Sequence, residues 1–432
     1  SEFSDGARQR IEEVVIRRLK RDINSQDAAA GQTPRFPERY PEPLPLYFGS
    51  AEKTLSAAFQ EFRRGVRRLT AQGGRREQLA GTFALEVLNK RLLSSPYTFA
   101  NSWYRFKEGL AQLEEAELVE VQAARRAVQE DVDDDREVEG RQLHAAKTTG
   151  AWLKPLLPHL EDEVAELDAA LEQMGLVSDN DHLPEPGEDA RWNRFLQLVK
   201  RRLRNGPQWV AEERLIVFTE YKTTLDYLER RLREAFPDNS AAIRVLFGGM
   251  GDAEREAIKL AFNDPDDPVR ILLATDTASE GLNLQETARL VLHYDIPFNP
   301  ARLDQRNGRL DRHGQARDVV VYHFTSEDDA DLKFLAHVVV KVNQIREDLG
   351  AMGEVFDAAF ERRFTDQLDT ELVTQQLDAE VERRRGRADI PHNAETRTGA
   401  EQALLDWLTA ELDLSPAALQ NTLERALGMG VG

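Results

Sequence analysis

Two of the three arginines between Gln305 and Gln315 are the side chains best suited to do chemistry. The stretch reads Gln-Arg-Asn-Gly-Arg-Leu-Asp-Arg-His-Gly-Gln, which sets Arg309 and Arg312 three residues apart. A short helix would project both from one face. The planar, permanently charged guanidinium matches phosphate oxygens, so the spacing indicates a clamp for a transferring phosphoryl group. The alternative, and the commoner meaning of a bare R-x-x-R pair, is a solvated basic helix face.

A second block, Leu273 to Leu284, leaves a predicted buried strand with small hydroxyl residues and then a Glu-Gly-Leu-Asn turn at 280–283. Hydroxyl and backbone N–H groups can bind the phosphates of one nucleic-acid strand without reading its sequence. Thr275 is the first such hydroxyl after the strand. Two weaker blocks place Thr219 and the pair Gly248-Gly249 just after other predicted strands. At Thr219 an ordinary strand-to-helix turn is the commoner meaning, and at the glycines a flexible turn before a capped helix is an equally simple interpretation.

One half of a nucleotide site is missing from the sequence. A phosphate-binding loop needs a Gly-rich turn followed by Gly-Lys-Ser/Thr, and no such string occurs. If the two arginines do meet a nucleotide, the chain therefore carries only the second half of an ATP site, and we expect it not to hydrolyse ATP alone.

Short apolar runs that alternate with helical patterns predict an α/β fold with a parallel sheet covered on both faces. The predicted strands are 215–218, 243–247, 269–274, 290–294 and 319–323. The predicted helices beside them are 192–205, 221–235 and 253–262. Open sheets of this kind bind ligands at the carboxyl ends of their strands, where all the blocks above lie.

The rest of the chain is predicted to be largely helical. An edge strand at 41–48, which contains Pro43 and Pro45, precedes helices near 50–70, 79–93, 99–129 and 152–174. Ser94-Ser95-Pro96 indicates a helix break with a capping serine, and 175–189 reads as a linker. The chain after Ser326 reads as helical to its end, with a break near Pro391.

The composition limits the function classes. The 432 residues carry a net charge of −20, which argues weakly against nucleic-acid binding because the acids cluster in segments such as 130–135. With no cysteine and no long apolar run, we expect a cytoplasmic protein without disulfides, a metal-ligand cluster or a membrane span. The opening Ser-Glu-Phe, which has no initiator Met, resembles a cloning scar, so we expect the chain to be a fragment.

The blocks from Leu215 to His323 together resemble the second RecA-like lobe of Swi/Snf-type ATPases in helicase superfamily two. Ile16 to Asp22 resembles the segment that joins the two lobes of that family, and Lys90 to Pro96 resembles its bacterial branch. Ile296-Pro297-Phe298 stands before Asn299-Pro300 where the eukaryotic branch has paired tryptophans, which disfavours chromatin remodelling.

The resemblance implies four domains: an inter-lobe linker (1–40), a helical insertion with an entry strand (41–190), the RecA-like lobe (191–326) and a helical extension (327–432). It implies that Arg312 is an arginine finger for ATP and Mg²⁺ held mainly by an absent first lobe, with Arg309 facing the phosphates. Gln305 would orient Arg309 or contact the first lobe. Further implied roles are lining the nucleotide cleft (Glu280, Gly281 and Asn283) and contacting the DNA backbone (Thr219, Gly248, Gly249 and Thr275).

The resemblance predicts a motor that moves on double-stranded DNA in the bacterial cytoplasm, at the nucleoid, with the first lobe of the same protein as its partner. Two alternatives stay open. The helical regions could be protein-docking modules built on a helicase-like scaffold, or the lobe could belong to an RNA-directed helicase.

Overall fold

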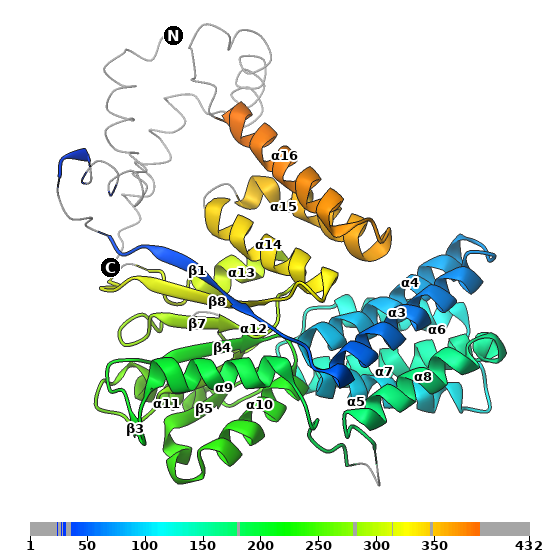
Figure 1. Ribbon diagram of the computed structural model, residues 1–432, viewed down its shortest axis with the longest axis horizontal. Helices are drawn as coiled ribbons and strands as arrows, with labels where there is room; N and C mark the ends of the chain where they lie inside the picture. Colours follow the sequence, from blue (N-terminus) through cyan, green and yellow to red (C-terminus); the bar gives the residue numbers. More distant parts are fainter. Residues whose placement is uncertain are drawn as a thin grey trace, which may run out of the picture. The chain divides into compact units, whose positions relative to one another are not determined.

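Six parallel strands form the central sheet of the computed structural model, in the order β1-β8-β7-β4-β6-β5 (Figure 1). The strands are β1 (Arg39–Pro45), β4 (Leu215–Thr219), β5 (Ile243–Leu246), β6 (Ile271–Thr275), β7 (Leu290–His293) and β8 (Val319–Thr325). The structure describes residues 24, 27, 29–31, 36–178, 182–279, 283–312, 314–345 and 349–388. The predicted α/β fold with a parallel sheet is confirmed.

The chain divides into two compact units, Ser1–Asp378 and Ala379–Gly432. The sheet, the helical insertion and the candidate site all lie in the first unit. The described part of the second unit is the end of α16 (Thr370–Ala388). The predicted linker helix near 11–20 and the predicted break near Pro391 fall outside the described residues.

The alternation of side chains along β4 joins the sheet to two separate hydrophobic cores. Leu215 and Val217 point into a core shared with the helical insertion, whereas Ile216 and Phe218 pack on the opposite face. Every residue of β4 and β6 is buried, as expected for parallel strands covered on both faces.

β1 lies at the edge of the sheet, where its prolines predicted it to be. A proline has no N–H to donate, so Pro41, Pro43 and Pro45 are tolerated only where one side of the strand is unpaired. The strand begins at Arg39 and pairs with β8 along its whole length. It is therefore part of the sheet of the lobe, whereas the predicted boundary placed it with the helical insertion.

The insertion between β1 and β4 is a block of helices beside the carboxyl ends of the strands (Figure 1). Its members are α3 (Ser50–Thr70), α4 (Arg75–Ser94), α5 (Pro96–Leu110), α6 (Leu118–Gln129), α7 (Asp135–Leu153), η1 (Lys154–His159) and α8 (Glu161–Gln173). The predicted helix near 50–70 is confirmed by α3, whose apolar stripe is buried, with Leu55, Phe59, Phe62 and Val66 each at most 1% exposed.

Two predicted helices of the insertion were wrong. The single helix expected over 99–129 is two helices, α5 and α6, separated by a polar connection that contains the fully exposed Leu113. The helix expected over 152–174 is replaced by η1 and α8, and α7 was not predicted. α7 begins after Asp134, whose side chain accepts a hydrogen bond from the Arg136 amide at 2.8 Å, so the acidic run supplies a helix cap.

Helices α9 (Ala190–Leu203), α10 (Lys222–Ala235), α11 (Asp252–Asn263) and α13 (Pro300–Asn307) accompany the strands. The shorter elements are α12 (Asp276–Ser279), η2 (Pro237–Ala242) and the hairpin of β2 (Arg204–Asn205) and β3 (Gln208–Trp209). The predicted helices near 192–205, 221–235 and 253–262 are confirmed by α9, α10 and α11 to within two residues at each end.

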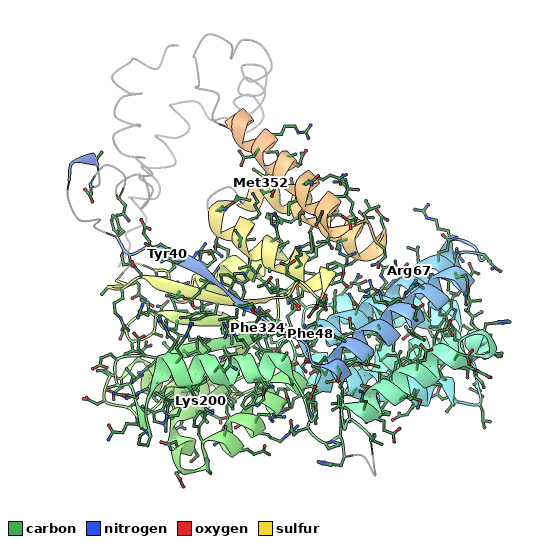
Figure 2. The ribbon with its side chains drawn as sticks, viewed as in Figure 1. Tyr40, Phe48, Arg67, Lys200, Phe324 and Met352 are labelled. Carbon is green, nitrogen blue, oxygen red and sulfur yellow. The ribbon has the colours of Figure 1, made fainter. Side chains whose placement is uncertain are left out.

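The chain after β8 packs back onto the insertion through α14 (Ala330–Ile345), α15 (Leu349–Phe360) and η3 (Glu361–Thr365). Arg67 of α3, labelled in Figure 2, donates to the Phe364 carbonyl at 2.9 Å, and Arg63 pairs with Asp331 at 3.0 Å. Burial and the neighbouring Arg63 lower the pKa of Arg67 to about 10. Within the described residues, no helix combines the length and apolar character that crossing a membrane requires.

Candidate functional site

The order of the strands reverses around β4, and the candidate site lies at that point. The chain runs from β4 outward to β5 and β6 on one side, then returns to β7 on the other side. Such a switch leaves a crevice outside the carboxyl ends of the two central strands, which is where open α/β sheets bind ligands. In this chain those ends carry Thr219 and Glu220 after β4, and Asp295 after β7.

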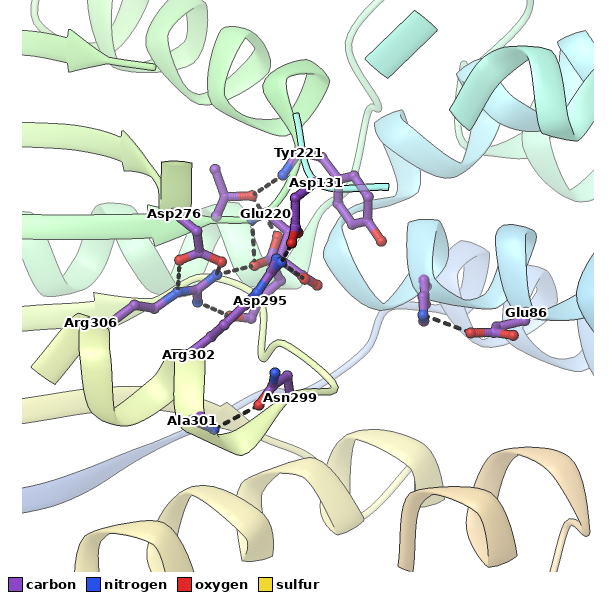
Figure 3. A network of polar contacts seen from close by, with 12 residues as sticks. Glu86, Asp131, Glu220, Tyr221, Asp276, Asp295, Asn299, Ala301, Arg302 and Arg306 are labelled. Carbon is purple, nitrogen blue, oxygen red and sulfur yellow. Dashed lines mark hydrogen bonds and ion pairs between the residues drawn. The ribbon is translucent and has the colours of Figure 1, made fainter. Parts of the chain in front are cut away.

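Asp295 links three segments at this crevice. One of its carboxylate oxygens accepts from the Thr219 hydroxyl (2.5 Å), and the other accepts from the Glu220 amide (2.9 Å) (Figure 3). The first oxygen also accepts from the Ser94 hydroxyl (2.7 Å). Ser94 ends α4, so the insertion is hydrogen-bonded directly to the carboxyl edge of the sheet. The hydrogen-bond network continues through the Thr224 hydroxyl, which lies 2.6 Å from the Ser94 hydroxyl.

Arg306 supplies the positive charge that this cluster requires. Its guanidinium donates to both carboxylate oxygens of Asp276, at 2.5 and 2.9 Å, and to the Asp295 carbonyl at 2.7 Å (Figure 3). Burial alone would lower the pKa of Arg306, but the two carboxylates outweigh it and raise the pKa. A buried charge is tolerated when it is paired and hydrogen-bonded in this way.

Glu220 is an acid of this edge that holds its proton tightly. Burial, followed by the charges of Asp295 and Asp276, raises its pKa to about 7. Its side chain is 22% exposed, and the Arg302 Nη1 group lies 3.8 Å from its Oε1. The carboxyl group can therefore gain or lose a proton near neutral pH.

The predicted arginine pair does not lie on one helix face. Helix α13 ends at Asn307, and residues 308–312 form turns and a bend, because Gly308 closes the helix and Gln315 draws the chain back to the sheet through the Ala288 carbonyl at 2.9 Å. Arg309 is buried, at 7% exposure, while Arg312 is exposed. Gln305 is exposed on the last turn of α13.

Arg312 and Asn283, predicted separately as site residues, lie together. The Arg312 Nη1 group donates to Oδ1 of Asn283, although 29 residues separate them. The Leu284 amide donates to the Arg309 carbonyl at 3.1 Å, which holds the two segments together through the backbone as well. Glu280, Gly281 and His313 lie outside the described residues.

The four residues expected to contact DNA meet protein groups in this structure. Thr219 is buried and donates to Asp295, and Thr275 is fully buried and donates to Asp135 of the insertion at 2.5 Å. The Gly248 amide also donates to Asp135, while Gly249 is exposed and has a φ of +88°. Glycine adopts such a positive φ at no steric cost.

Three residues of the cluster were not predicted from the sequence: Arg306, Asp276 and Asp295. Arg306 and Asp276 lie inside blocks that had been singled out, each next to a predicted residue, so their position was a usable signal. Among the described residues, no three His, Asp or Glu side chains are grouped so that they could hold a metal ion.

Comparison with known proteins agrees with this geometry. Residues 196–314 match the helicase conserved C-terminal domain family. The uncharacterized ATP-dependent helicase YqhH of Bacillus subtilis (strain 168) is 30% identical over 144 residues, which are 33% of this chain and 24% of YqhH. The RNA polymerase-associated protein RapA of Vibrio cholerae serotype O1 (strain M66-2) is 35% identical over 136 residues, which are 32% of this chain and 14% of RapA.

The crystal structure of the C-terminal part of the Fun30 ATPase domain is aligned over 77% of this chain and 100% of its own, at 16% identity. Its TM-score of 0.39 is too low to support a conclusion. The sequence matches to YqhH and RapA each span less than a quarter of the length of those proteins. Within this chain, residues 196–314 form the C-terminal lobe of a superfamily-two helicase.

Proposed function

We propose that this chain is the C-terminal half of a DNA-dependent ATPase or translocase of the Swi/Snf type, acting in the bacterial cytoplasm on the nucleoid. The observation that carries the proposal is the pairing of Arg312 with Asn283. An exposed guanidinium stands on a turn next to the block that follows β6, at the edge where such sheets bind ligands. A solvated basic helix face would not bring these two blocks together.

In this proposal Arg312 is the arginine finger, which reaches ATP and Mg²⁺ held mainly by a first RecA-like lobe. Its charge would stabilise the transferring phosphoryl group, and the fork of a guanidinium suits that task better than an ammonium. Arg309, which is buried in the same turn, would face the phosphates beside it. The remaining proposed roles are orienting Arg309 or contacting the first lobe (Gln305) and lining the nucleotide cleft (Glu280, Gly281 and Asn283).

ATP as the cofactor is supported by the ATP-dependent helicase YqhH among the relatives. The chain has no Gly-Lys-Ser/Thr phosphate loop, so it would have no ATPase activity without the first lobe. The proposed nucleic acid is double-stranded DNA, contacted through the edge that carries Thr219, Gly248, Gly249 and Thr275.

A docking function is the second candidate. One observation on a relative and one on this chain favour it. RapA is by its name an RNA polymerase-associated protein. In this chain Leu113, in the connection between α5 and α6, is 98% exposed, and Val119, in the first turn of α6, is 68% exposed, an arrangement suited to an apolar partner. The helical insertion would then bind a protein, with the lobe as its scaffold.

The salt dependence of binding separates these candidates. The chain is titrated onto a duplex DNA, a single-stranded DNA and a duplex RNA of equal length between 50 and about 200 mM salt. We expect binding to the DNA duplex that weakens steeply with salt, because phosphate contacts release counterions. Tighter binding to duplex RNA would favour the RNA-directed helicase, and no binding to any of the three would favour docking.

A further inference from the structure

The run of acids that joins α6 to α7 lies on the proposed DNA-contacting edge. This acidic segment, Glu130–Asp135, reads Glu-Asp-Val-Asp-Asp-Asp and belongs to the insertion rather than to the lobe. It meets the loop after β5 and the end of β6, which are more than a hundred residues away in the sequence. Its position accounts for the burial of Gly248 and Thr275.

One carboxylate oxygen makes the central contact. Oδ2 of Asp135 accepts from the Gly248 amide and, at 2.5 Å, from the Thr275 hydroxyl. The Asp135 amide donates back to the Gly248 carbonyl at 3.2 Å, so the contact is reciprocal. Asp135 is only 4% exposed. A backbone N–H and a hydroxyl that converge on one anionic oxygen are the donors that proteins use to hold a nucleic-acid phosphate.

Two neighbouring acids extend the contact, one towards the loop after β5 and the other towards α13. A Cβ added at Gly249 would lie 2.6 Å from Cγ of Asp134, so the glycine allows the segment to approach closely. At the other end, Asp131 lies 4.0 Å from Nη2 of Arg302 on α13 (Figure 3). The segment therefore spans from the loop after β5 to the helix that precedes the arginine turn.

Cations surround the same place. Lys222 lies 4.2 Å from the ring centre of Phe247, and the Arg136 guanidinium lies 5.1 Å from it. Arg302 lies beside Asp131, and Lys222 also pairs with Asp226 at 2.5 Å, so the three cations form a patch that carboxylates partly neutralise, in a chain whose net charge is −20. Such a patch suits a phosphate backbone, and carboxylates are the groups of this chain that can take the place of phosphates.

We infer that the acidic segment mimics a nucleic-acid backbone and occludes the DNA-contacting edge, so that DNA must displace Asp135 in order to bind Gly248 and Thr275. The inference rests on the proposed function, because it takes these residues as DNA contacts. A protein whose binding-competent state is only a fraction of its population binds with an affinity reduced by that fraction. The segment thus holds the lobe in a closed state that duplex DNA opens.

The helix before the segment is held lightly enough for this movement. Of the 12 residues of α6, only Val121 and Ala124 are buried, so its displacement exposes little apolar surface. α7, by contrast, packs closely against α5, with Gly150 against the Phe106 carbonyl. The residues before Asp135 would therefore move with α6, and the first turn of α7, which carries Asp135, would open while the rest of α7 stays in place.

The test compares two variants that remove the same charge from different places. The first is Asp133→Asn, Asp134→Asn and Asp135→Ala, in which asparagine at 134 preserves the cap of α7. The control is Glu161→Gln, Asp162→Asn and Glu163→Gln in the first turn of α8. The affinity of each chain for the same DNA duplex is measured at fixed salt, together with the hydrogen exchange of the 247–250 amides. The single variant Asp135→Asn, which keeps the shape of the side chain, serves if the triple variant does not fold.

We expect the first variant to bind duplex DNA about tenfold more tightly or better, since two donors to an anion are released. Its Gly248 amide should exchange faster, while the control should stay within about twofold of the parent, as expected for a small change in net charge. Equal gains in both variants, or binding by the parent as tight as by the first variant, would overturn the occlusion and leave the proposed function standing. No binding by any chain would overturn both.

Discussion

At the scale of single residues, Asp295 decides how the candidate site is built. It is 5% exposed and accepts hydrogen bonds from the lobe, through Thr219, and from the insertion, through Ser94. A buried carboxylate is costly unless its oxygens are satisfied and a cation is near, and Arg306 fulfils the second condition. One side chain therefore fixes the insertion to the switch point of the sheet.

Glu220, which contacts the same cluster, should make stability depend on pH. Its pKa is about 7 in the folded chain and 4.5 in the unfolded chain, so the folded state binds the proton more tightly. This contribution is fully present below pH 4.5 and is lost as the pH rises through 7. We expect urea unfolding to show that the free energy of unfolding of Glu220→Gln, relative to that of the parent, rises by up to about 3 kcal/mol from pH 5 to pH 8.

The matched control for this prediction is Glu256→Gln on α11, whose side chain is 56% exposed. Its free energy of unfolding should stay within about 0.5 kcal/mol of the parent value at both pH values. A difference between parent and Glu220→Gln that stays constant from pH 5 to pH 8 would show that the folded chain does not raise this pKa.

At the scale of elements, the crossing of α5 and α7 holds the insertion together. A Cβ built at Gly150 would overlap with the Phe106 carbonyl oxygen, and a Cβ built at Gly109 would overlap with the Lys147 carbonyl oxygen. Gly150→Ala should therefore lower the free energy of unfolding by about 1 to 3 kcal/mol or more, because the two helices must separate. Chemical denaturation measures this change.

Gly140→Ala, in the same helix, is the control. Nothing lies within 4 Å of a Cβ built there, so alanine should raise the stability by up to about 1 kcal/mol through its helix propensity. If both alanines stabilise the chain, the close approach of α5 and α7 is not present in solution.

The strands could be predicted from the sequence because their signal is local. Leu215 to Phe218 and Ile271 to Ala274 are continuous apolar runs, and both became strands that are buried on both faces. The break at Ser94-Ser95-Pro96 was predicted for the same reason, and Ser95 caps α5 by accepting from the Thr98 amide at 3.0 Å. The split between α5 and α6 was missed because the packing of α6 against α7, rather than a Gly or Pro, turns the chain.

The candidate site could be predicted only in part. The family resemblance implied that Arg312 and Asn283 belong to one nucleotide site, and in the structure the two side chains are hydrogen-bonded. The pairing of Asp135 with Gly248 and Thr275 depends on how the insertion folds onto the lobe, and no local pattern encodes that contact. Arg306 was passed over because spacing alone does not tell which of three arginines in one stretch is buried.

At the scale of the whole molecule, the carboxyl edge of the sheet is the surface on which the account depends. The insertion covers one part of that edge through Ser94 and Asp135, and the turn that carries Arg312 emerges at another. A net charge of −20 does not exclude a DNA-binding motor, because a local set of cations (Lys222, Arg136 and Arg302) lies beside that edge.

ATP turnover by the full-length gene product, with and without duplex DNA, tests the central claim most directly. We expect Arg312→Ala to lower the DNA-stimulated turnover by a factor of about 10³ or more while leaving DNA affinity unchanged, because a finger acts on the transition state. Arg126→Ala, an exposed arginine on α6, should match the parent. Turnover of Arg312→Ala equal to that of Arg126→Ala would contradict the assignment of Arg312 as the residue that completes the ATP site.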